Sequence, residues 1–257
     1  MKKLPISIIV TTYNEEYLLA KCLSKLTFCD ELLVVDLGSN DNSVEIARKY
    51  ASKIIQHKKV PYVEKILVKF VPKLKNEWVM HIDPDEVLDE NLIDEIKEKI
   101  KSSKSIAIIR IPWVFYYKGK KIKGTVWGGK KYKRVIYNKK RVKFKDLVHN
   151  GSKIIEGDEI KIESNYALHH YWMNSYSQLL EKHKRYIKAE GKKRFANNER
   201  YSLQKKIKES TKSLIKNLIL SKGIMYGPRS IFLSFFHVWY VWQSNNSLRK
   251  YEKNKYH

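Results

Sequence analysis

Cysteine is scarce in this sequence, and acidic side chains are outnumbered. The 257 residues contain only two cysteines, Cys22 and Cys29, which excludes a disulfide framework and fits a reducing cytosol. We expect both to be small, buried apolar residues. Asp and Glu total 27 against 52 Lys and Arg, which gives a formal net charge of +25. This excess predicts attraction to something anionic, such as a nucleic acid, a phospholipid surface or a phosphorylated compound.

Long hydrophobic runs are also absent. The N-terminus enters a short strand-like run after Pro5 without the apolar stretch of a signal peptide, so we expect the protein to stay inside the cell. The most apolar late segment, 231–242, is too short to span a bilayer and contains His237. Its aromatic residues precede several lysines and arginines, which suits peripheral attachment to an anionic membrane surface. The alternative is a helix packed on the domain core.

The first hundred residues alternate between two hydrophobic patterns. Short β-branched runs predict strands at 6–10, 32–36, 53–56 and 78–82, and helical spacing follows at 18–26, 43–51, 62–74 and after Asp89. Such alternation predicts an α/β fold with a mainly parallel sheet covered on both faces. Ligands bind beyond the carboxyl ends of such strands. We therefore expect the polar loops at Thr11, Asp36 and Asp83 to share one cleft.

The pattern changes after residue 105. Short strands at 106–111, 133–137 and 160–163 predict a mixed, partly antiparallel half, and the stretch 118–145 has many lysines and no acidic residue. Helical patterns follow at 175–191 and 203–220. We predict a catalytic domain at 1–172, divided into halves at 1–103 and 104–172, and a helical extension at 173–257.

Two carboxylates, Asp83 and Asp85, stand one residue apart at the end of a predicted buried strand. They offer hard oxygen ligands for Mg²⁺ or Mn²⁺, and Pro84 restricts Asp83 to extended geometry. A cation held there and shared with a diphosphate would neutralise charge on a departing nucleotide. Acidic turns after strands are common, so an ordinary structural turn is the alternative for this pair taken alone.

Three segments of the sequence together resemble the conserved motifs of a known enzyme family. Ser7–Glu15 (SIIVTTYNE), Leu33–Ser43 (LVVDLGSNDNS) and Glu77–Glu86 (EWVMHIDPDE) resemble glycosyltransferase family 2 in order and spacing, especially its lipopolysaccharide-core glucosyltransferase-like branch. Later residues are similar too: Trp127–Gly129, Arg134–Tyr137, Val148, His149, His170, Ser175, Lys182 and Tyr186. The resemblance implies a GT-A (Rossmann-like) fold, with a mixed, mainly parallel sheet flanked by helices and a C-terminal helical extension.

The resemblance also implies roles for individual residues. The nucleotide-sugar would be bound by Thr11, Tyr13, Glu15, Asp36, Ser39 and Asp83. Thr11 would contact the base through its backbone, Tyr13 would stack on the base, and Asp36 would accept its imide N–H. Asp85 would be the main ligand of Mn²⁺ or Mg²⁺, with Asp83 contacting the ribose or the metal through water. His170 would complete the metal or diphosphate site. An ordinary loop histidine is the alternative for both His169 and His170.

Several residues depart from the family pattern. Leu37 replaces a second acid after Asp36, and Lys65 or Lys69 would have to supply a positive charge that relatives place near 67–68. Asn150 stands where the branch usually has a glutamate, and asparagine cannot take a proton from an acceptor hydroxyl. Asp146 and Glu86 are the candidate catalytic bases in its place.

These features predict a metal-dependent, inverting glycosyltransferase of cell-envelope or lipopolysaccharide biosynthesis. It would move a hexose from a UDP-sugar to a lipid-linked or cell-surface glycan, and would lie on the inner face of the cytoplasmic membrane. A catalytically weak homologue is one alternative. A basic nucleic-acid-binding protein is another, but we find no recognised motif and expect no nucleic-acid partner. A nucleotidyl-transfer enzyme would usually need a glycine-rich phosphate cradle, which is absent.

Overall fold

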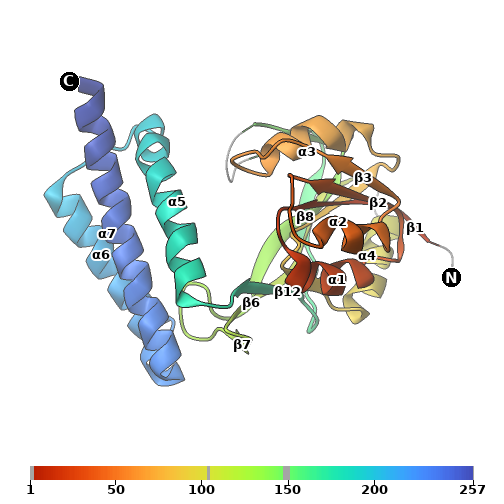
Figure 1. Ribbon diagram of the computed structural model, residues 1–257. Coiled ribbons are helices and arrows are strands. Elements are labelled where there is room, and N and C mark those ends of the chain that lie inside the picture. Colours follow the sequence, from red (N-terminus) through yellow and green to blue (C-terminus); the bar gives the residue numbers. More distant parts are fainter. Residues whose placement is uncertain (1–2, 103–104, 147–150, 257) are drawn as a thin grey trace. The chain divides into compact units, whose positions relative to one another are not determined.

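The computed structural model describes residues 3–102, 105–146 and 151–256, and the chain divides into two compact units. Unit 1 comprises Met1–Val114 and Lys130–His170, and unit 2 comprises Phe115–Gly129 and Tyr171–His257. Unit 1 contains most of the sheet and unit 2 the long C-terminal helices (Figure 1). The segment 115–129, which we assigned to the acceptor-side half, lies in unit 2.

The predicted alternation of strands and helices is confirmed in unit 1. Four parallel strands lie in the order β3-β2-β1-β4. They are β1 (Leu4–Thr12), β2 (Cys29–Asp36), β3 (Lys53–Gln56) and β4 (Trp78–Ile82). The helices are α1 (Glu16–Ser24), α2 (Ser43–Arg48), α3 (Glu64–Phe70), which a short 3₁₀ turn η1 (Val71–Lys73) continues, and α4 (Asn91–Ser102).

The alternation of side chains along β1 explains why both faces of the sheet are covered. Ile8 and Val10 point into one apolar cluster, where they meet side chains of α1, α2 and α4. Ile9 points to the other face and joins Ile66 and Phe70 of α3. Helices therefore lie on both faces (Figure 1). Cys22 and Cys29 are buried free thiols in the first cluster, as expected.

The rest of the sheet is mixed, as predicted. The strand β8 (Lys131–Asn138) pairs antiparallel with both β4 and β6 (Ile106–Tyr117), and β11 (Asp158–Lys161) pairs parallel with β6. Short strands complete the described elements: β5 (Glu86–Leu88), β7 (Lys120–Lys121), β9 (Val142–Phe144), β10 (Ser152–Ile154) and β12 (Leu168–Met173). The histidines at 169 and 170 lie in β12 and not in a loop, and His170 is the register partner of Glu86 in β5.

Unit 2 contains three long helices joined by short turns. They are α5 (Tyr176–Ala196), α6 (Leu203–Ile215) and α7 (Pro228–Tyr256), with a π-helical turn η2 (Lys216–Leu220) and a 3₁₀ turn η3 (Gly223–Tyr226) between α6 and α7. Ser175 and Ser202 cap α5 and α6 by accepting N–H groups of Gln178 and Lys205 at 3.1 Å. None of the described helices combines the length and apolar character needed to cross a bilayer.

Candidate active site

The carboxyl ends of β1, β2 and β4 lie side by side, as the sequence predicted. Thr12 is the register partner of Asp36, and Val10 is that of Ile82. The N–H of Leu37 donates to the carbonyl oxygen of Thr12 at 2.9 Å, which extends the pairing past the end of β2. The loops that follow these strands therefore start from one edge of the sheet, where α/β folds bind ligands.

Reciprocal hydrogen bonds join the loops after β1 and β2. The N–H of Asn14 donates to the hydroxyl of Ser39, and the N–H of Asn40 donates to the side-chain oxygen of Asn14, both at 2.9 Å. The N–H of Glu15 donates to the hydroxyl of Ser43 at 2.9 Å. Asn14 adopts a left-handed backbone conformation with φ 54° that brings these groups together. Ser39 thus orders the loop that presents Tyr13.

Asp36 is held in a fixed orientation at the end of β2. Its side chain is buried, and its carboxylate accepts the N–H groups of Gly38 at 3.1 Å and Ser39 at 3.2 Å. Gly38 has φ +86°, a conformation that suits glycine and closes this turn. These contacts keep the carboxylate at the loop edge, where it can accept a further hydrogen bond from a ligand.

Tyr13 presents its ring to solvent beside basic side chains. The ring is 38% exposed, and the ammonium of Lys59 lies 3.5 Å from its centroid. Lys69 lies 2.9 Å from the Nε2 atom of His57, whose backbone N–H donates to the carbonyl of Asp36. Lys65 is instead paired with Asp146 at 2.7 Å. Lys59, which the sequence did not single out, therefore lies beside the loop after β1, and Lys69 lies near the end of β2 through His57.

A half-buried lysine occupies the centre of the acidic turn after β4. The Nζ atom of Lys133 lies 2.6 Å from Asp83 Oδ2, and 2.7 and 2.8 Å from the two carboxylate oxygens of Glu86. Glu86 also accepts the indole N–H of Trp113 at 2.7 Å and the N–H of Asp83 at 3.0 Å. Glu86 is fully buried, so these donors replace the water it has lost.

The electrostatics of this cluster follow from burial and close pairing. Burial opposes the charge on Lys133, but Asp83 and Glu86 outweigh it and raise the Lys133 pKa above its usual value. Burial also opposes the charge on Asp83, but Lys133 and His81 lower the Asp83 pKa below its usual range. Burial raises the pKa of Glu86. Lys133 therefore stays protonated and Asp83 ionised at neutral pH.

Asp85 points to a different partner from its two acidic neighbours. Its Oδ2 atom lies 3.0 Å from His170 Nε2, and the His170 ring stacks on Trp113 with centroids 5.1 Å apart and planes at 10°. The two side chains share this hydrogen bond, and both the carboxylate oxygen and the imidazole nitrogen are possible ligands of a divalent cation. Among the described residues, no group of three or more His, Cys, Asp and Glu could hold a metal ion. Asp85 and His170 could supply two ligands of a cation, and the others would have to come from a phosphate and water.

The two candidate bases have different surroundings. Glu86 is enclosed by Lys133, Trp113 and the Asp83 backbone. Asp146 is exposed and paired with Lys65, and hydrogen bonds from Lys65 and Tyr62 lower its pKa. Val148, His149 and Asn150, which the resemblance singled out, lie outside the described residues.

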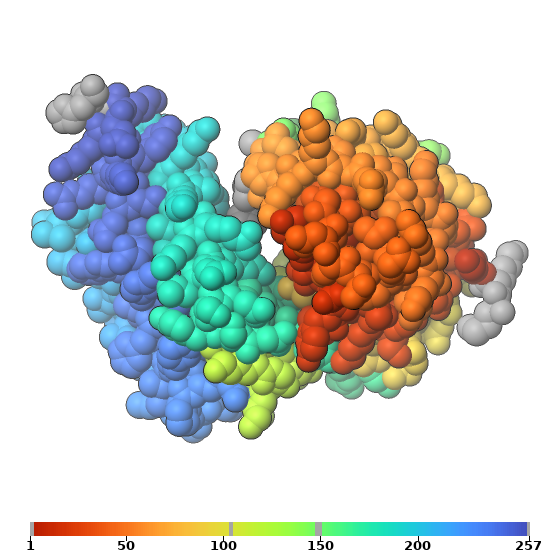
Figure 2. Space-filling view, in the orientation of Figure 1, coloured from red at the N-terminus to blue at the C-terminus, as the bar shows by residue number. Residues whose placement is uncertain are grey.

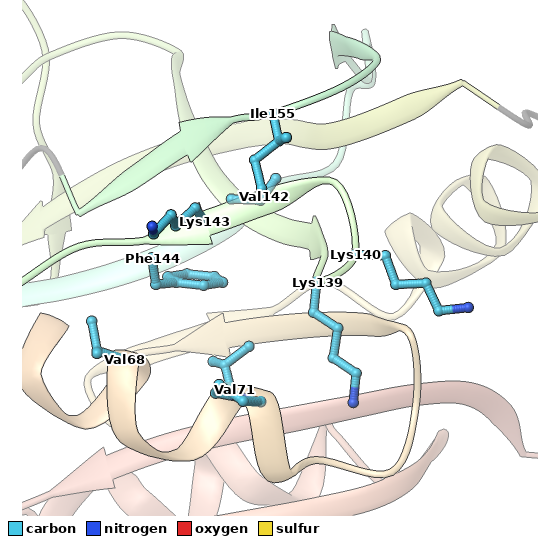
Figure 3. Close-up of a pocket in the computed structure, with 9 residues that line it drawn as sticks. Val68, Val71, Lys139, Lys140, Val142, Lys143, Phe144 and Ile155 are labelled. Carbon is cyan, nitrogen blue, oxygen red and sulfur yellow. The ribbon is translucent and has the colours of Figure 1, made fainter.

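A separate hollow of about 510 Å³ lies between the end of α3 and the β9 strand (Figure 3). Its lining is apolar apart from three lysines and includes none of the predicted site residues. The lining residues are Val68, Val71, Pro72, Lys139, Lys140, Val142, Lys143, Phe144 and Ile155.

The partly parallel, partly mixed sheet, with loops gathered at one strand edge, has the GT-A fold. The family model of glycosyl transferase family 2 matches residues 7–153. The chain belongs to this family and is a glycosyltransferase, and the match confirms the resemblance inferred from the three motifs.

Individual relatives agree with this assignment. An uncharacterized glycosyltransferase of Rickettsia typhi is 27% identical over 238 residues, which cover 88% of this chain and 80% of the relative. The lipopolysaccharide core biosynthesis glycosyltransferase LpsC of Rhizobium meliloti is 30% identical over 122 residues, or 45% of each chain. The crystal structure of S. aureus TarS 1–349 in complex with UDP-GlcNAc is 14% identical with a TM-score of 0.50, over 72% of this chain and 65% of that one, and supports the fold alone.

Proposed function

We propose that this protein transfers a hexose from a UDP-sugar, with inversion, to a lipid-linked or cell-surface glycan at the inner face of the cytoplasmic membrane. The observation that supports this most is the common edge of the sheet from which Tyr13, Asp36 and Asp85 arise, with His170 of β12 paired to Asp85. LpsC is a lipopolysaccharide core glycosyltransferase and TarS was crystallised with UDP-GlcNAc, which favours this substrate class.

The nucleotide would lie over the joined loops after β1 and β2. Tyr13 offers an exposed ring for stacking on the base, and Asp36 offers a fixed carboxylate for the imide N–H. The hydroxyl of Thr11 is buried and has no hydrogen-bond partner in the described part of the chain, which leaves it for a ligand group. Glu15 and Ser39 hold the two loops together through their backbone and hydroxyl groups.

Asp85 and His170 would hold Mn²⁺ or Mg²⁺. When bound, such an ion neutralises charge on the diphosphate that leaves the sugar. Trp113 fixes the plane of the His170 ring by stacking. Asp83, held by Lys133, would accept a hydrogen bond from a ribose hydroxyl or a water molecule. Lys133 thereby acts as a positioning residue that keeps Asp83 ionised and in place.

Binding of UDP together with Mn²⁺ tests this proposal. At about one hundred times the dissociation constant, a ligand stabilises the folded state by about 2.7 kcal/mol, which is roughly 5–11 °C in melting temperature for a chain of this size. We expect UDP and Mn²⁺ to give this rise together in a thermal-shift assay. A rise produced by RNA without metal would favour the nucleic-acid-binding alternative instead.

Replacing Tyr13 with alanine removes the stacking platform. Base–aromatic stacking contributes about 1–3 kcal/mol, so we expect UDP to bind roughly 5- to 150-fold more weakly to Tyr13→Ala in titration calorimetry. Tyr17→Ala is the matched control, because Tyr17 is 82% exposed on the neighbouring helix. Equal weakening by both variants would refute stacking on Tyr13.

We further propose Asp146 as the catalytic base, because Glu86 is buried behind three hydrogen-bond donors. General-base catalysis contributes roughly 10²- to 10⁴-fold, so Asp146→Asn should lower kcat by at least about 100-fold while UDP affinity is unchanged. Lys65→Met is the control, since it removes the ion pair and keeps the carboxylate. Unchanged turnover in Asp146→Asn would exclude this residue as the base.

A further inference from the structure

Unit 2 exposes a group of large apolar side chains at the connection between α6 and α7. We call this group the apolar tip and define it as Ile219, Leu220, Ile224, Met225 and Tyr226. The first four are 65–74% exposed. The backbone beneath them is ordered by hydrogen bonds: the N–H of Ser221 donates to the carbonyl of Lys216 at 2.8 Å, and that of Met225 to Lys222 at 3.0 Å. Clustered apolar residues presented on an ordered turn mark an interaction surface.

The charge around the apolar tip has one sign. From Ser210 to Tyr251 the chain contains no Asp or Glu. The cations nearest the tip in sequence are Lys212, Lys216, Lys222 and Arg229, and both Lys216 and Lys222 are exposed. Such a surface would repel another basic protein, including a second copy of this chain, and attract an anionic partner.

A second lysine-rich segment is hydrogen-bonded to the same end of unit 2. The hydroxyl of Ser230 donates to the carbonyl of Lys123 at 2.6 Å, and the N–H of Val126 donates to the Asn217 side chain at 2.9 Å. A Cβ atom on Gly124 would lie 2.3 Å from the Tyr226 ring, so the two segments touch. Figure 2 shows the yellow-green segment against the blue start of α7. The exposed lysines of this segment are Lys118, Lys120, Lys121 and Lys123.

We propose that the apolar tip inserts into the interface of an anionic bilayer, with the lysines of 118–123 and 212–222 among the headgroups. Apolar side chains bordered by cations are the chemistry that monotopic attachment requires, because the apolar groups leave water while the charges meet anionic lipid. An acidic protein partner would need an apolar groove matched to side chains such as Leu220 and Met225, whereas a bilayer interface accepts them without a matched shape. The chemistry therefore favours lipid.

This proposal relocates the membrane contact that the sequence suggested. The segment 231–242 lies in α7, where Leu233 and Phe236 are buried and Phe236 packs edge-on to His183 of α5 at 4.8 Å. Part of that segment therefore packs against another helix of unit 2, and Phe232, Phe235 and Trp242 remain exposed. The exposed side chains of the apolar tip come before the segment 231–242 in the sequence.

Co-sedimentation of the full chain with vesicles tests the proposal. We expect binding to phosphatidylglycerol-containing vesicles at low salt and little binding to pure phosphatidylcholine. The double variant Leu220→Gln/Met225→Gln should bind at least about tenfold more weakly, because it removes two inserting side chains. Ile155→Gln is the matched control, since Ile155 is a 66% exposed apolar residue of unit 1.

The proposal deepens the membrane location given under the proposed function, but vesicle binding needs neither donor nor metal. Loss of vesicle binding can therefore be distinguished from loss of UDP binding, and both are measured on the same variants. Wild-type vesicle affinity in the double variant would overturn the proposal, as would equal binding to neutral vesicles. A dimer in gel filtration that the double variant converts to monomer would also overturn it, because the tip would then be a self-association surface.

Discussion

Asp85→Asn is expected to abolish metal-dependent sugar transfer. The substitution keeps the shape of the side chain but removes its charge, and His170 alone is a poor ligand for Mg²⁺ or Mn²⁺. A bound cation contributes several kcal/mol to stabilising charge on a leaving phosphate. We therefore expect at least about a 1000-fold fall in kcat/KM, and loss of Mn²⁺ binding measured by electron paramagnetic resonance in the presence of UDP.

Asp94→Asn provides the control for Asp85→Asn. Asp94 is an exposed helical acid paired with Lys97 at 2.7 Å, so its loss should leave Mn²⁺ binding unchanged. Comparing the two variants also separates loss of the metal from loss of nucleotide binding. Without metal, Asp85→Asn and Asp94→Asn should bind UDP with equal affinity. Retained Mn²⁺ affinity in Asp85→Asn would show that Asp85 is not a ligand of the cation.

The sequence predicted the N-terminal half of unit 1 well because its signals are local. Ile8, Ile9 and Val10 belong to a short β-branched run that predicts a buried strand without reference to the rest of the chain. The polar turn at Asp36–Ser39 separates two periodic segments, so the sequence shows it as a break. The strand β5 was missed because three residues are too few to show a period. His170 was predicted as a site residue only through the family resemblance, since its strand β12 pairs with the distant strand β5.

Lys133 shows what a sequence pattern cannot supply. It stands among several lysines between 130 and 140, and nothing local separates the one that enters the acidic turn from those that face solvent. Its position depends on β8 pairing antiparallel with β4, which brings a residue near 133 next to Asp83. Trp113 was missed for the same reason, because β6 and β8 must pair before its indole can reach Glu86. Lys133 and Trp113 can be placed in the site only when the order of the strands is known. Neither residue propensity nor hydrophobic spacing predicts that order.

Lys133→Met should destabilise the protein more than any surface change. Glu86 would be left buried without its cation, so it would have to hold an unpaired charge or take up a proton, and breaking a buried ion pair on one side costs about 3–5 kcal/mol. For a chain of this size that corresponds to a fall of roughly 6–20 °C in melting temperature by calorimetry. Lys140→Met is the control, because Lys140 is 72% exposed and its pair with Glu77 at 2.9 Å contributes about 0–1 kcal/mol.

The reason for the destabilisation can be separated from a simple packing defect. If the unpaired charge of Glu86 causes the loss, Lys133→Met/Glu86→Gln should recover part of the stability that Lys133→Met loses, so the two substitutions will be far from additive. A packing defect would make the double variant worse than either single one. Because Lys133 also holds Asp83, the recovered double variant should still bind UDP more weakly than the wild type does. Full UDP affinity in that variant would show that Asp83 needs no cation to keep its place, and Lys133 would then stabilise the fold without positioning the donor site.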